Sequence, residues 1–357
     1  MEKIKFSIIG AGAGGTLMAV QLKNKGYYVK LMDKRADVID KMKELGELKA
    51  SGKTEATEKP DLLTCDIKEC IEDTDVIMVC TTTDAHGDIA REAAPFIKSN
   101  QIVLLNPGHM GGTLEFINTL KDCGCKEIPT VGEASDLMYA CRTIEIGHTL
   151  QTGEKSKISI ASIPAKNSEI ICNKLKEIFP CFVPVENVLV TGLSGGSLLH
   201  SIPCVMNINK VELGQTFDYY MEGLTPGICN IIEAADKERC SVCEALGMAS
   251  PTLLSHLKNV YGLEPDGFYA AIQSCKPYAG IKSPTNTNHR FFQEDTLSNL
   301  VPTASLGKLL GVATPTIDAI ILLESQITGK DFNKEGRTVE KLGLAGKTIK
   351  EIYELIS

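Results

Sequence analysis

A glycine-rich turn near the start of the chain constrains the fold more than any other part of the sequence. An apolar run over residues 4–9 precedes the glycines, which occupy residues 10–15 in the order GAGAGG. A helical pattern follows to about residue 24, and a second apolar run, residues 28–32, ends at Asp33. Strand, G-x-G-x-x-G turn, helix, strand and acidic residue in this order are typical of a dinucleotide-binding βαβ unit.

Each part of the turn has a physical role in binding a dinucleotide. Gly10 permits the tight turn, Gly12 lets the backbone approach a pyrophosphate, and Gly15 lets the helix pack close to the strand. The start of the helix offers unpaired N–H groups and a partial positive charge to the phosphates. A purely structural tight turn is the alternative explanation of the glycines. The residues expected to contact the cofactor are Gly10, Ala11, Gly12, Ala13, Gly15, Asp33 and Thr81.

The acidic residue after the second strand bears on the choice of cofactor. Asp33 is placed to accept hydrogen bonds from the adenosine ribose, and its carboxylate would repel the 2′-phosphate of NADP. Lys34 and Arg35 follow directly, and either can pair with that phosphate. We therefore expect NAD as the cofactor, with NADP as the alternative.

The length and the net charge limit the classes of protein to which the chain can belong. A chain of 357 residues exceeds one ordinary core, so we expect two domains. The net charge of −8 argues against nucleic acid as a partner. No segment approaches the roughly 18–20 uncharged apolar residues that a membrane span needs, and the opening strand is not a secretory signal peptide. We expect a cytoplasmic protein that acts on small molecules; a homodimer is one assembly that the sequence leaves open.

The thirteen cysteines are expected to be free thiols in a reducing cytosol, because their number is odd and no secretory signal is present. Two pairs, Cys123/Cys125 and Cys240/Cys243, have spacings that metal or redox sites use. Neither pair has a second pair at ligand spacing. Ordinary buried or surface cysteines are therefore favoured, and no metal site is expected.

Residues 1–186 alternate strand and helix patterns, as a parallel α/β sheet of the Rossmann type requires. Thr81, Thr82 and Thr83 follow one expected strand, at the place where open α/β sheets bind a cofactor. Capping of the next helix explains these threonines equally well. The glycine-rich turn over residues 106–112 is expected at the same sheet edge. Further strands are expected at residues 76–80, 102–105, 128–131, 143–146, 158–161 and 182–185, and a helix at residues 168–178.

Residues 187–357 have long helical periods and few β-branched runs, which predicts a second, mostly α-helical domain. A dinucleotide-binding domain alone does not specify a reaction, so the catalytic residues are sought in this second domain. The expected helices cover residues 196–209, 217–246, 253–261, 306–311 and 315–327.

His200 is the first catalytic candidate, because it lies on the first long helix after the link between the domains. Many dehydrogenases with a helical second half carry an acid/base lysine or histidine there, and no lysine precedes Lys210 in this helix. An imidazole titrates near neutrality and can exchange a proton with a carbonyl or an imine. A histidine satisfied within the core is the alternative.

Residues 287–295 concentrate charge between two apolar regions and supply the other candidates. Arg290 can hold a carboxylate through two parallel hydrogen bonds, which lysine does poorly. Asp295 can orient and stabilise a charged His200, as a carboxylate does for a catalytic imidazole. His289 competes with His200 for the role of base. A solvated loop with local Arg–Asp pairs is the simpler alternative for the whole segment.

Several motifs occur in an order and at spacings that together are specific for a protein family. They are residues 10–15, 106–108, 111–112, 132–142 (GEASDLMYACR), 217–226 (FDYYMEGLTP), 236–239 (DKER), 290–295 (RFFQED) and 311–315 (GVATP), together with His200. Over nearly its whole length the chain resembles the opine dehydrogenase family, of the octopine/nopaline dehydrogenase type. The resemblance implies an NAD(P)-dependent oxidoreductase acting on CH–NH bonds. It also implies a catalytic pair of His200 with Asp295, and Arg290 as the residue that holds the keto-acid carboxylate.

Departures from the family pattern concern the substrates. Gly196 stands where family members often have asparagine, four residues before the catalytic histidine. His86 is offset from its usual position, where this chain has Asp88. Contacts to the substrate carbonyl and to the amine therefore cannot be carried over from the family at these positions. The chain has no tryptophan, so an aromatic wall for the amino donor cannot be indole.

The reaction that the resemblance implies is a reversible reductive condensation. A pyruvate-like α-keto acid and the amino group of an amino acid lose water to give an imine, which then accepts a hydride. The first alternative is a 2-keto-acid or ketopantoate-type reductase that forms a hydroxy acid. Such enzymes generally use lysine on the helix that here carries His200. The second alternative is a non-catalytic NAD-binding protein that kept the fold.

Overall fold

The computed structural model of the chain describes residues 3–264 and 266–357. It divides into two compact units, of which the first runs to Gly192 and also includes Ile352–Ser357, while the second is Leu193–Glu351. The boundary expected from the sequence lay between residues 186 and 187. In the structure, helix α7 (Val188–Gly192) belongs to the first unit. The C-terminal residues return to the same unit, where the Ala165 N–H donates to the Ser357 carbonyl.

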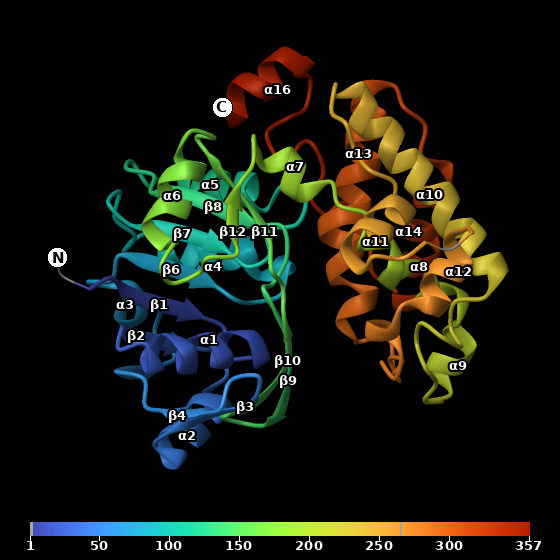
Figure 1. Cartoon of the computed structure of the whole chain (residues 1–357). Coiled ribbons are helices and arrows are strands. Elements are labelled where there is room, and N and C mark those ends of the chain that lie inside the picture. Colours follow the sequence, from blue (N-terminus) through green and yellow to red (C-terminus); the bar gives the residue numbers. More distant parts are fainter. Residues whose placement is uncertain (1–2, 265) are drawn as a thin grey trace. The chain divides into compact units, whose positions relative to one another are not determined.

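The first unit is built on an eight-stranded sheet in the order β12-β11-β8-β7-β6-β1-β2-β5 (Figure 1). Neighbouring strands are parallel except β8 and β11, which are antiparallel. This order confirms the expected Rossmann-type fold. The strands are β1 (Lys5–Ile9), β2 (Tyr28–Met32), β5 (Leu62–Thr64), β6 (Val76–Val79), β7 (Ile102–Leu105), β8 (Thr130–Ala134), β11 (Ile158–Ile163) and β12 (Phe182–Pro184).

Helices cover both faces of this sheet because the strands are apolar on both sides. In β1, Phe6 and Ile8 face one core, and Ile9 faces the other. Parallel sheets with two covered faces have such apolar strands. The first core is closed by α1 (Ala13–Asn24), α2 (Ala36–Leu45) and α6 (Asn167–Leu175), and the second by α3 (Ile67–Ile71), α4 (His86–Ala93) and α5 (Gly112–Asp122).

A second sheet in the same unit differs from the sequence expectation of one parallel sheet. Its order is β4-β3-β10-β9, and β9 pairs antiparallel with β10. The sheet packs on α1, where the Tyr139 hydroxyl donates to Gln21 Oε1 and the Thr149 hydroxyl to the Ala13 carbonyl. Its buried positions include polar residues such as Gln151, so an apolar run does not mark the strand. The strands are β3 (Leu48–Gly52), β4 (Ala56–Glu58), β9 (Tyr139–Glu145) and β10 (His148–Glu154).

The second unit is helical, as the sequence predicts, and its longest helix, α10, packs against α8, α12, α13 and α14. Ile202, Ile232 and Ile320 are buried in the shared core. The predicted helix over residues 217–246 was wrong in its first part, because α10 begins only at Pro226. Proline favours the first helical position and disfavours helix in the residue before it. The helices are α8 (Leu198–Met206), α9 (Ile208–Glu212), α10 (Pro226–Ala245), α11 (Leu253–Tyr261), α12 (Phe268–Ser274), α13 (Val301–Leu310), α14 (Pro315–Thr328) and α15 (Phe332–Glu335).

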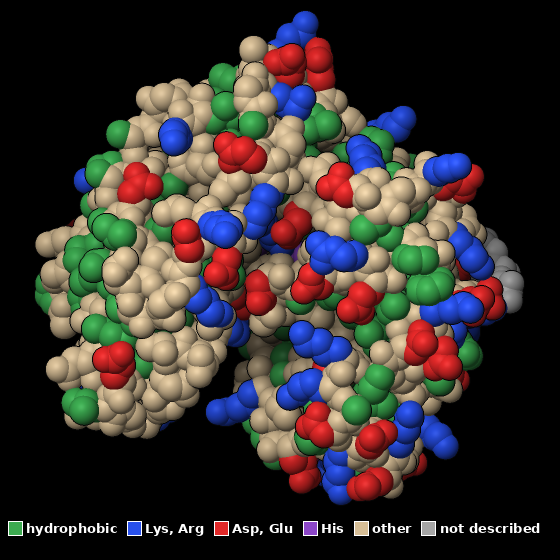
Figure 2. Space-filling model, turned by 180° about the vertical axis from the view of Figure 1, so that it is seen from behind, with side chains coloured by type: hydrophobic (Ala, Val, Ile, Leu, Met, Phe, Trp, Pro, Cys, Tyr) green, Lys and Arg blue, Asp and Glu red, His purple; other side chains and the backbone are tan. Residues whose placement is uncertain are grey.

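The surface mixes charges of both signs. Figure 2 shows acidic and basic side chains interspersed over the face that it presents. Across the described residues, every helix is too short or too polar to pass through a lipid bilayer.

Candidate functional site

The strand register of the first unit brings four separated residues to one sheet edge. Ile9 pairs with Met32 on one side and with Val79 on the other, and Val79 pairs with Leu105. The residue that follows each strand therefore lies at the same carboxyl edge, where open α/β sheets bind their ligands. These following residues are Gly10, Asp33, Cys80 and Asn106.

The glycines of the turn are required by close packing. Gly10 has φ +105°, and a Cβ there would lie 2.6 Å from the Cys80 carbonyl oxygen. A Cβ at Gly15 would lie 1.8 Å from the Gly10 oxygen, so α1 can approach β1 only with glycine at this position. At Gly12, in contrast, a Cβ would meet no described atom within 4 Å. The backbone next to the start of α1 is thus open for a ligand, as a pyrophosphate needs.

Asp33 is held at this edge by two backbone groups. The Ala11 N–H donates to Oδ2 at 2.9 Å, and the Arg35 N–H donates to Oδ1 at 3.0 Å. The Arg35 Nε lies 3.5 Å from Oδ1, on a side chain that is 59% exposed. The carboxylate is therefore fixed beside the glycine turn, and an exposed guanidinium lies next to it. Lys34 is exposed as well.

Thr81 lies beside the same turn. A Cβ added at Gly10 would lie 2.9 Å from the Thr81 Cγ2, and the Thr81 hydroxyl donates to the Thr82 carbonyl at 3.1 Å. Thr82 precedes the short 3₁₀ turn Thr83–Ala85, and in the described structure its side chain makes no capping hydrogen bond. The structure thus brings the residues expected at the cofactor together at one edge, and their glycine cradle and carboxylate fit a dinucleotide. Their binding role stays a prediction.

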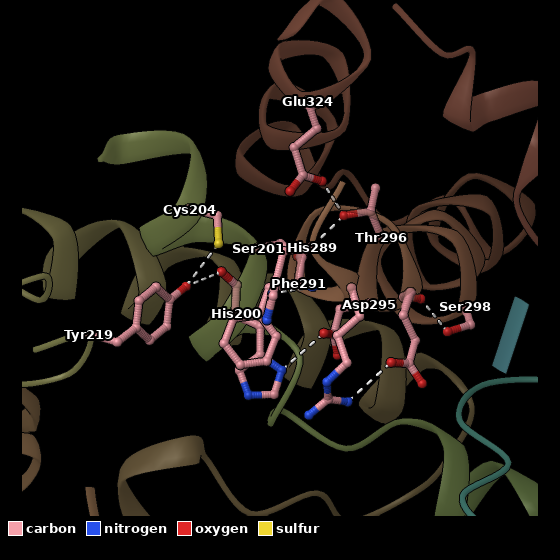
Figure 3. Close-up of polar contacts among 12 residues, drawn as sticks. His200, Ser201, Cys204, Tyr219, His289, Phe291, Asp295, Thr296, Ser298 and Glu324 are labelled. Atoms are coloured by element: carbon pink, nitrogen blue, oxygen red, sulfur yellow. Dashed lines mark hydrogen bonds and ion pairs between the residues drawn. The ribbon is translucent and has the colours of Figure 1, made fainter. Parts of the chain in front are cut away.

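In the second unit, His200 on α8 contacts Asp295 (Figure 3). His200 Nδ1 lies 2.9 Å from Asp295 Oδ2, which is the expected contact between residues 95 positions apart. The aspartate side chain is 3% exposed and the histidine side chain 24%. An ionised carboxylate only accepts hydrogen bonds, so Nδ1 carries the proton in this pair. In the neutral ring Nε2 is then the basic nitrogen, and it is available for substrate chemistry.

The position of Asp295 depends on an irregular helix start. Asp295 precedes the π-helical segment Thr296–Leu300, in which the Val301 N–H donates to the Thr296 carbonyl, five residues back. Pro302 follows in α13, and it lacks the N–H that an α-helix would direct to the Ser298 carbonyl. Wide turns of this kind are frequent at functional sites. From the sequence, a helix was expected only at residues 306–311, so the π-helical segment was not predicted.

The imidazole of His200 is also held by its neighbours. The Phe291 ring stacks on it with 4.1 Å between centroids and 7° between planes. The Tyr219 hydroxyl donates to the His200 carbonyl. His289, the competing base, accepts the Phe291 N–H at its Nδ1 and caps the 3₁₀ turn Arg290–Phe292. Burial lowers the pKa of His289, with the charges of Arg290 and His200 acting in the same direction. His289 thus has a local structural role that His200 lacks.

Arg290 lies near the pair but bonds to a different carboxylate. Its Nη1 lies 3.1 Å from Glu294 Oε2, and its guanidinium stands 5.2 Å from the Phe291 ring centroid. The arginine side chain is 55% exposed, whereas that of Glu294 is 4% exposed. The local acidic partner of Arg290 is therefore Glu294, while Asp295 pairs with His200. A buried carboxylate holds one edge of the guanidinium, and the exposed remainder can meet an anion.

Three buried residues behind the pair were missed by the sequence analysis. Ser201, Thr296 and Glu324 are fully buried and hydrogen-bonded in series. A signal was present for Glu324, because it continues the apolar stripe of α14 that includes Ile317, Ile320 and Ile321. An acidic residue at such a position must be paired or neutral.

Among the described residues, the cysteines form no cluster with other metal-binding groups. All thirteen are free thiols. Within the part of the chain that the structure describes, no group of three or more His, Cys, Asp or Glu side chains is arranged to hold a metal ion. Cys240, from one of the two close pairs, accepts a hydrogen bond from the buried Arg239 at 3.2 Å.

Comparisons with known proteins match two parts of the chain to described families. Residues 184–328 match the family described as NAD/NADP octopine/nopaline dehydrogenase, alpha-helical domain, and residues 6–111 match ketopantoate reductase PanE/ApbA. The chain is 37% identical over 350 residues to opine dehydrogenase from Arthrobacter sp. (strain 1C), covering 98% of this chain and 97% of that protein.

Solved structures show the same fold. An octopine dehydrogenase structure in complex with NADH and agmatine matches with a TM-score of 0.82 and 18% identity, covering 98% of both chains. An NADP⁺-bound yersinopine dehydrogenase matches with a TM-score of 0.77 and 15% identity, covering 99% of this chain and 97% of the other.

Proposed function

The chain belongs to the opine dehydrogenase family, and from this premise we propose that it catalyses the reductive condensation of an α-keto acid with the amino group of an amino acid. The reaction is reversible, uses NAD(P)H, and takes a pyruvate-like keto acid. The observation that carries the proposal is the 2.9 Å contact between His200 and Asp295 in the helical unit. A dinucleotide fold alone would not distinguish this reaction from other hydride transfers.

The first unit, expected from the sequence as residues 1–186, is proposed to bind the dinucleotide. The open backbone at Gly12 and the start of α1 would hold the pyrophosphate. Asp33 would hold the adenosine ribose, which favours NAD over NADP. When bound, the reduced nicotinamide supplies the hydride that the imine carbon accepts. Ala11, Ala13 and Thr81 complete the proposed contacts.

The helical unit, expected from the sequence as residues 187–357, is proposed to bind the substrates and exchange protons with them. Arg290 binds the keto-acid carboxylate through the guanidinium edge that Glu294 leaves open. The amine adds to the keto carbon, and His200, protonated at Nε2, gives a proton to the hydroxyl that leaves as water. Asp295 stabilises the imidazolium while it carries that charge. Fixing both substrates is itself a large part of the rate acceleration.

Two further points belong to this proposal. A cytoplasmic location agrees with thirteen free thiols, which persist in reducing compartments. The homodimer stays a prediction, which light scattering at micromolar concentration would test.

A screen of cofactor oxidation tests the proposed reaction. NADH and NADPH are each combined with pyruvate or glyoxylate, crossed with a panel of amino acids, and absorbance at 340 nm is followed. The proposal expects oxidation that depends on both the keto acid and the amine. Oxidation by keto acid alone would favour the hydroxy-acid reductase, whose family match is confined to residues 6–111. Dinucleotide binding with no oxidation for any pair would favour the non-catalytic alternative.

A further inference from the structure

A second connection runs directly behind the His200–Asp295 pair. Ser201 follows His200 and Thr296 follows Asp295, and their hydroxyl oxygens lie 3.0 Å apart. Thr296 in turn is hydrogen-bonded to Glu324 on α14. Figure 3 shows this series leading away from the pair toward α14. Two adjacent links thus join α8 to the π-helical segment, and the second link ends on a carboxyl group.

The carboxyl group of Glu324 lies in surroundings that disfavour a charge. The residue is fully buried, and its Oε1 has no hydrogen-bond partner among the described residues. Burial raises the pKa of Glu324 well above its ordinary value; the Thr296 hydrogen bond acts in the opposite direction, and the nearby charge of Asp295 raises it further. Burial therefore favours the protonated form of Glu324.

The hydrogen-bond series has a direction. The Thr296 hydroxyl donates to Glu324 Oε2. Its oxygen is then left to accept from the Ser201 hydroxyl, 3.0 Å away. The Ser201 oxygen also lies 3.5 Å from the carbonyl oxygen of Phe291, whose ring stacks on His200. The carboxyl group of Glu324 thus ends the series as its acceptor.

We propose that Glu324 is a positioning residue for the reaction: acting through Thr296 and Ser201, it holds α8 against the π-helical segment so that His200 and Asp295 stay in contact. This inference rests on the proposed function of that pair.

Other titratable groups near Glu324 do not disturb this arrangement. Cys204, on α8, is buried and contacts Tyr219. Burial raises the pKa of both groups, so neither ionises near neutral pH. Asp295, on the π-helical side, is the charged neighbour that acts on Glu324.

Conservative and disruptive variants at two positions test the role. Glu324→Gln keeps an oxygen that accepts from Thr296 and Thr296→Ser keeps the hydroxyl, so both should retain turnover within about 3-fold. Glu324→Met and Thr296→Val remove the acceptor or the hydroxyl and should lower kcat by about 10-fold or more, the scale for small misplacements of a catalytic group. The dissociation constant of NADH, measured by fluorescence titration, should change less than about 2-fold. Ser325→Ala, at the next position of α14, is the matched control.

The split between kcat and KM separates positioning from general stability. Thr296→Val should lower kcat while the KM of each substrate changes less than about 2-fold. Glu324→Gln should restore most of the kcat that Glu324→Met loses. Unchanged kcat in Thr296→Val would overturn the proposal. A kcat in Glu324→Gln as low as that of Glu324→Met would equally overturn it.

A direct observation of the His200–Asp295 contact distinguishes this inference from the proposed reaction. The NMR resonance of the His200 Nδ1 proton, assigned with a His200→Ala variant, reports the hydrogen bond to Asp295 without any turnover. If no keto-acid and amine pair is consumed, the proposed function fails, while loss of this resonance in Thr296→Val still supports the positioning role. If turnover is found but the resonance is the same in wild type and Thr296→Val, only the positioning role fails.

Discussion

The two candidate sites of this molecule are built from different parts of the chain. The dinucleotide edge consists of backbone: a glycine turn, the start of α1 and two N–H groups that hold Asp33. The candidate catalytic site consists of side chains, in which His200 is held by Asp295, Phe291 and a buried hydroxyl series. The glycine turn and Asp33 lie within 33 residues of sequence, whereas His200 and Asp295 are 95 positions apart.

The two sites therefore differ in the substitutions that they tolerate. A backbone site is sensitive to any Cβ that fills its space, whatever the chemistry of the side chain. A side-chain site is sensitive to the loss of one donor or acceptor, because the partner is then left buried and unsatisfied. Substitutions that affect the backbone site and the side-chain site separately test this difference.

The largest effect is expected from His200→Ala. Turnover should fall by roughly 10²–10⁴-fold, the usual scale for one acid/base group, because no other group takes over the proton transfer. The affinity for NADH should be retained, since the cofactor residues lie in the first unit. Steady-state kinetics and NADH fluorescence measure the two quantities, with His256→Ala, an exposed histidine, as control. Unchanged turnover would remove His200 from the catalytic role.

Asp33→Ala is expected to come next. Hydrogen bonds to a charged group contribute roughly 1.5–3 kcal/mol, so the NADH dissociation constant should rise about 10- to 100-fold. Binding of NADPH should weaken less, because its phosphate no longer meets a carboxylate. Titration of both cofactors against wild type and Lys34→Ala gives the comparison. Equal weakening for both cofactors would contradict the proposed contact with the ribose.

Two glycine substitutions separate packing from ligand approach. Gly15→Ala places a Cβ 1.8 Å from the Gly10 oxygen and should destabilise the fold by about 1–3 kcal/mol or more. Gly12→Ala meets no described atom within 4 Å, so its melting temperature should remain near that of wild type while NADH affinity falls. Thermal unfolding and cofactor titration are measured for both. A stable Gly15→Ala variant would show that α1 can shift away from β1.

Arg290→Lys should give a smaller and more selective effect. Lysine keeps the charge but loses the planar two-bond contact, so the KM for the keto acid should rise by about 10-fold. The KM for the amine should stay within about 2-fold if Arg290 contacts only the keto-acid carboxylate. Initial rates with each substrate varied in turn decide this. A change confined to the amine would assign Arg290 to the other substrate.

The same difference between a local backbone site and a side-chain site determined how much could be predicted from the sequence. Residues 4–33 specify much of their fold locally, because the close packing that requires Gly15 is against the Gly10 carbonyl of the same turn. The second sheet was missed because Gln151 and Thr149 are buried through hydrogen bonds instead of apolar contacts. The false start of α10 came from treating residues 217–225 as helical despite Pro226.

The candidate catalytic site was only partly predictable. The pairing of His200 with Asp295 was expected from the chemistry of the two side chains and implied by the family resemblance, because no local pattern links residues 95 positions apart. Glu294 was overlooked as the partner of Arg290, although the i, i+4 spacing indicates it. Glu324 was overlooked although it continues the apolar stripe of α14, and its partner Thr296 lies in another element.

The buried acid on α14 makes folding a proton-binding event. In the unfolded chain glutamate loses its proton above a pKa of about 4.3, whereas burial raises the folded-state pKa of Glu324 well above that value. Between these two pKa values the native state binds one more proton at Glu324, so the contribution of this group to stability declines as pH rises, by up to about 1.4 kcal/mol per pH unit. Urea unfolding at pH 5.5, 6.5 and 7.5 should therefore show that the free energy of unfolding of Glu324→Gln increases relative to that of wild type as the pH rises. A constant difference would mean that the native protein folds without taking up this proton.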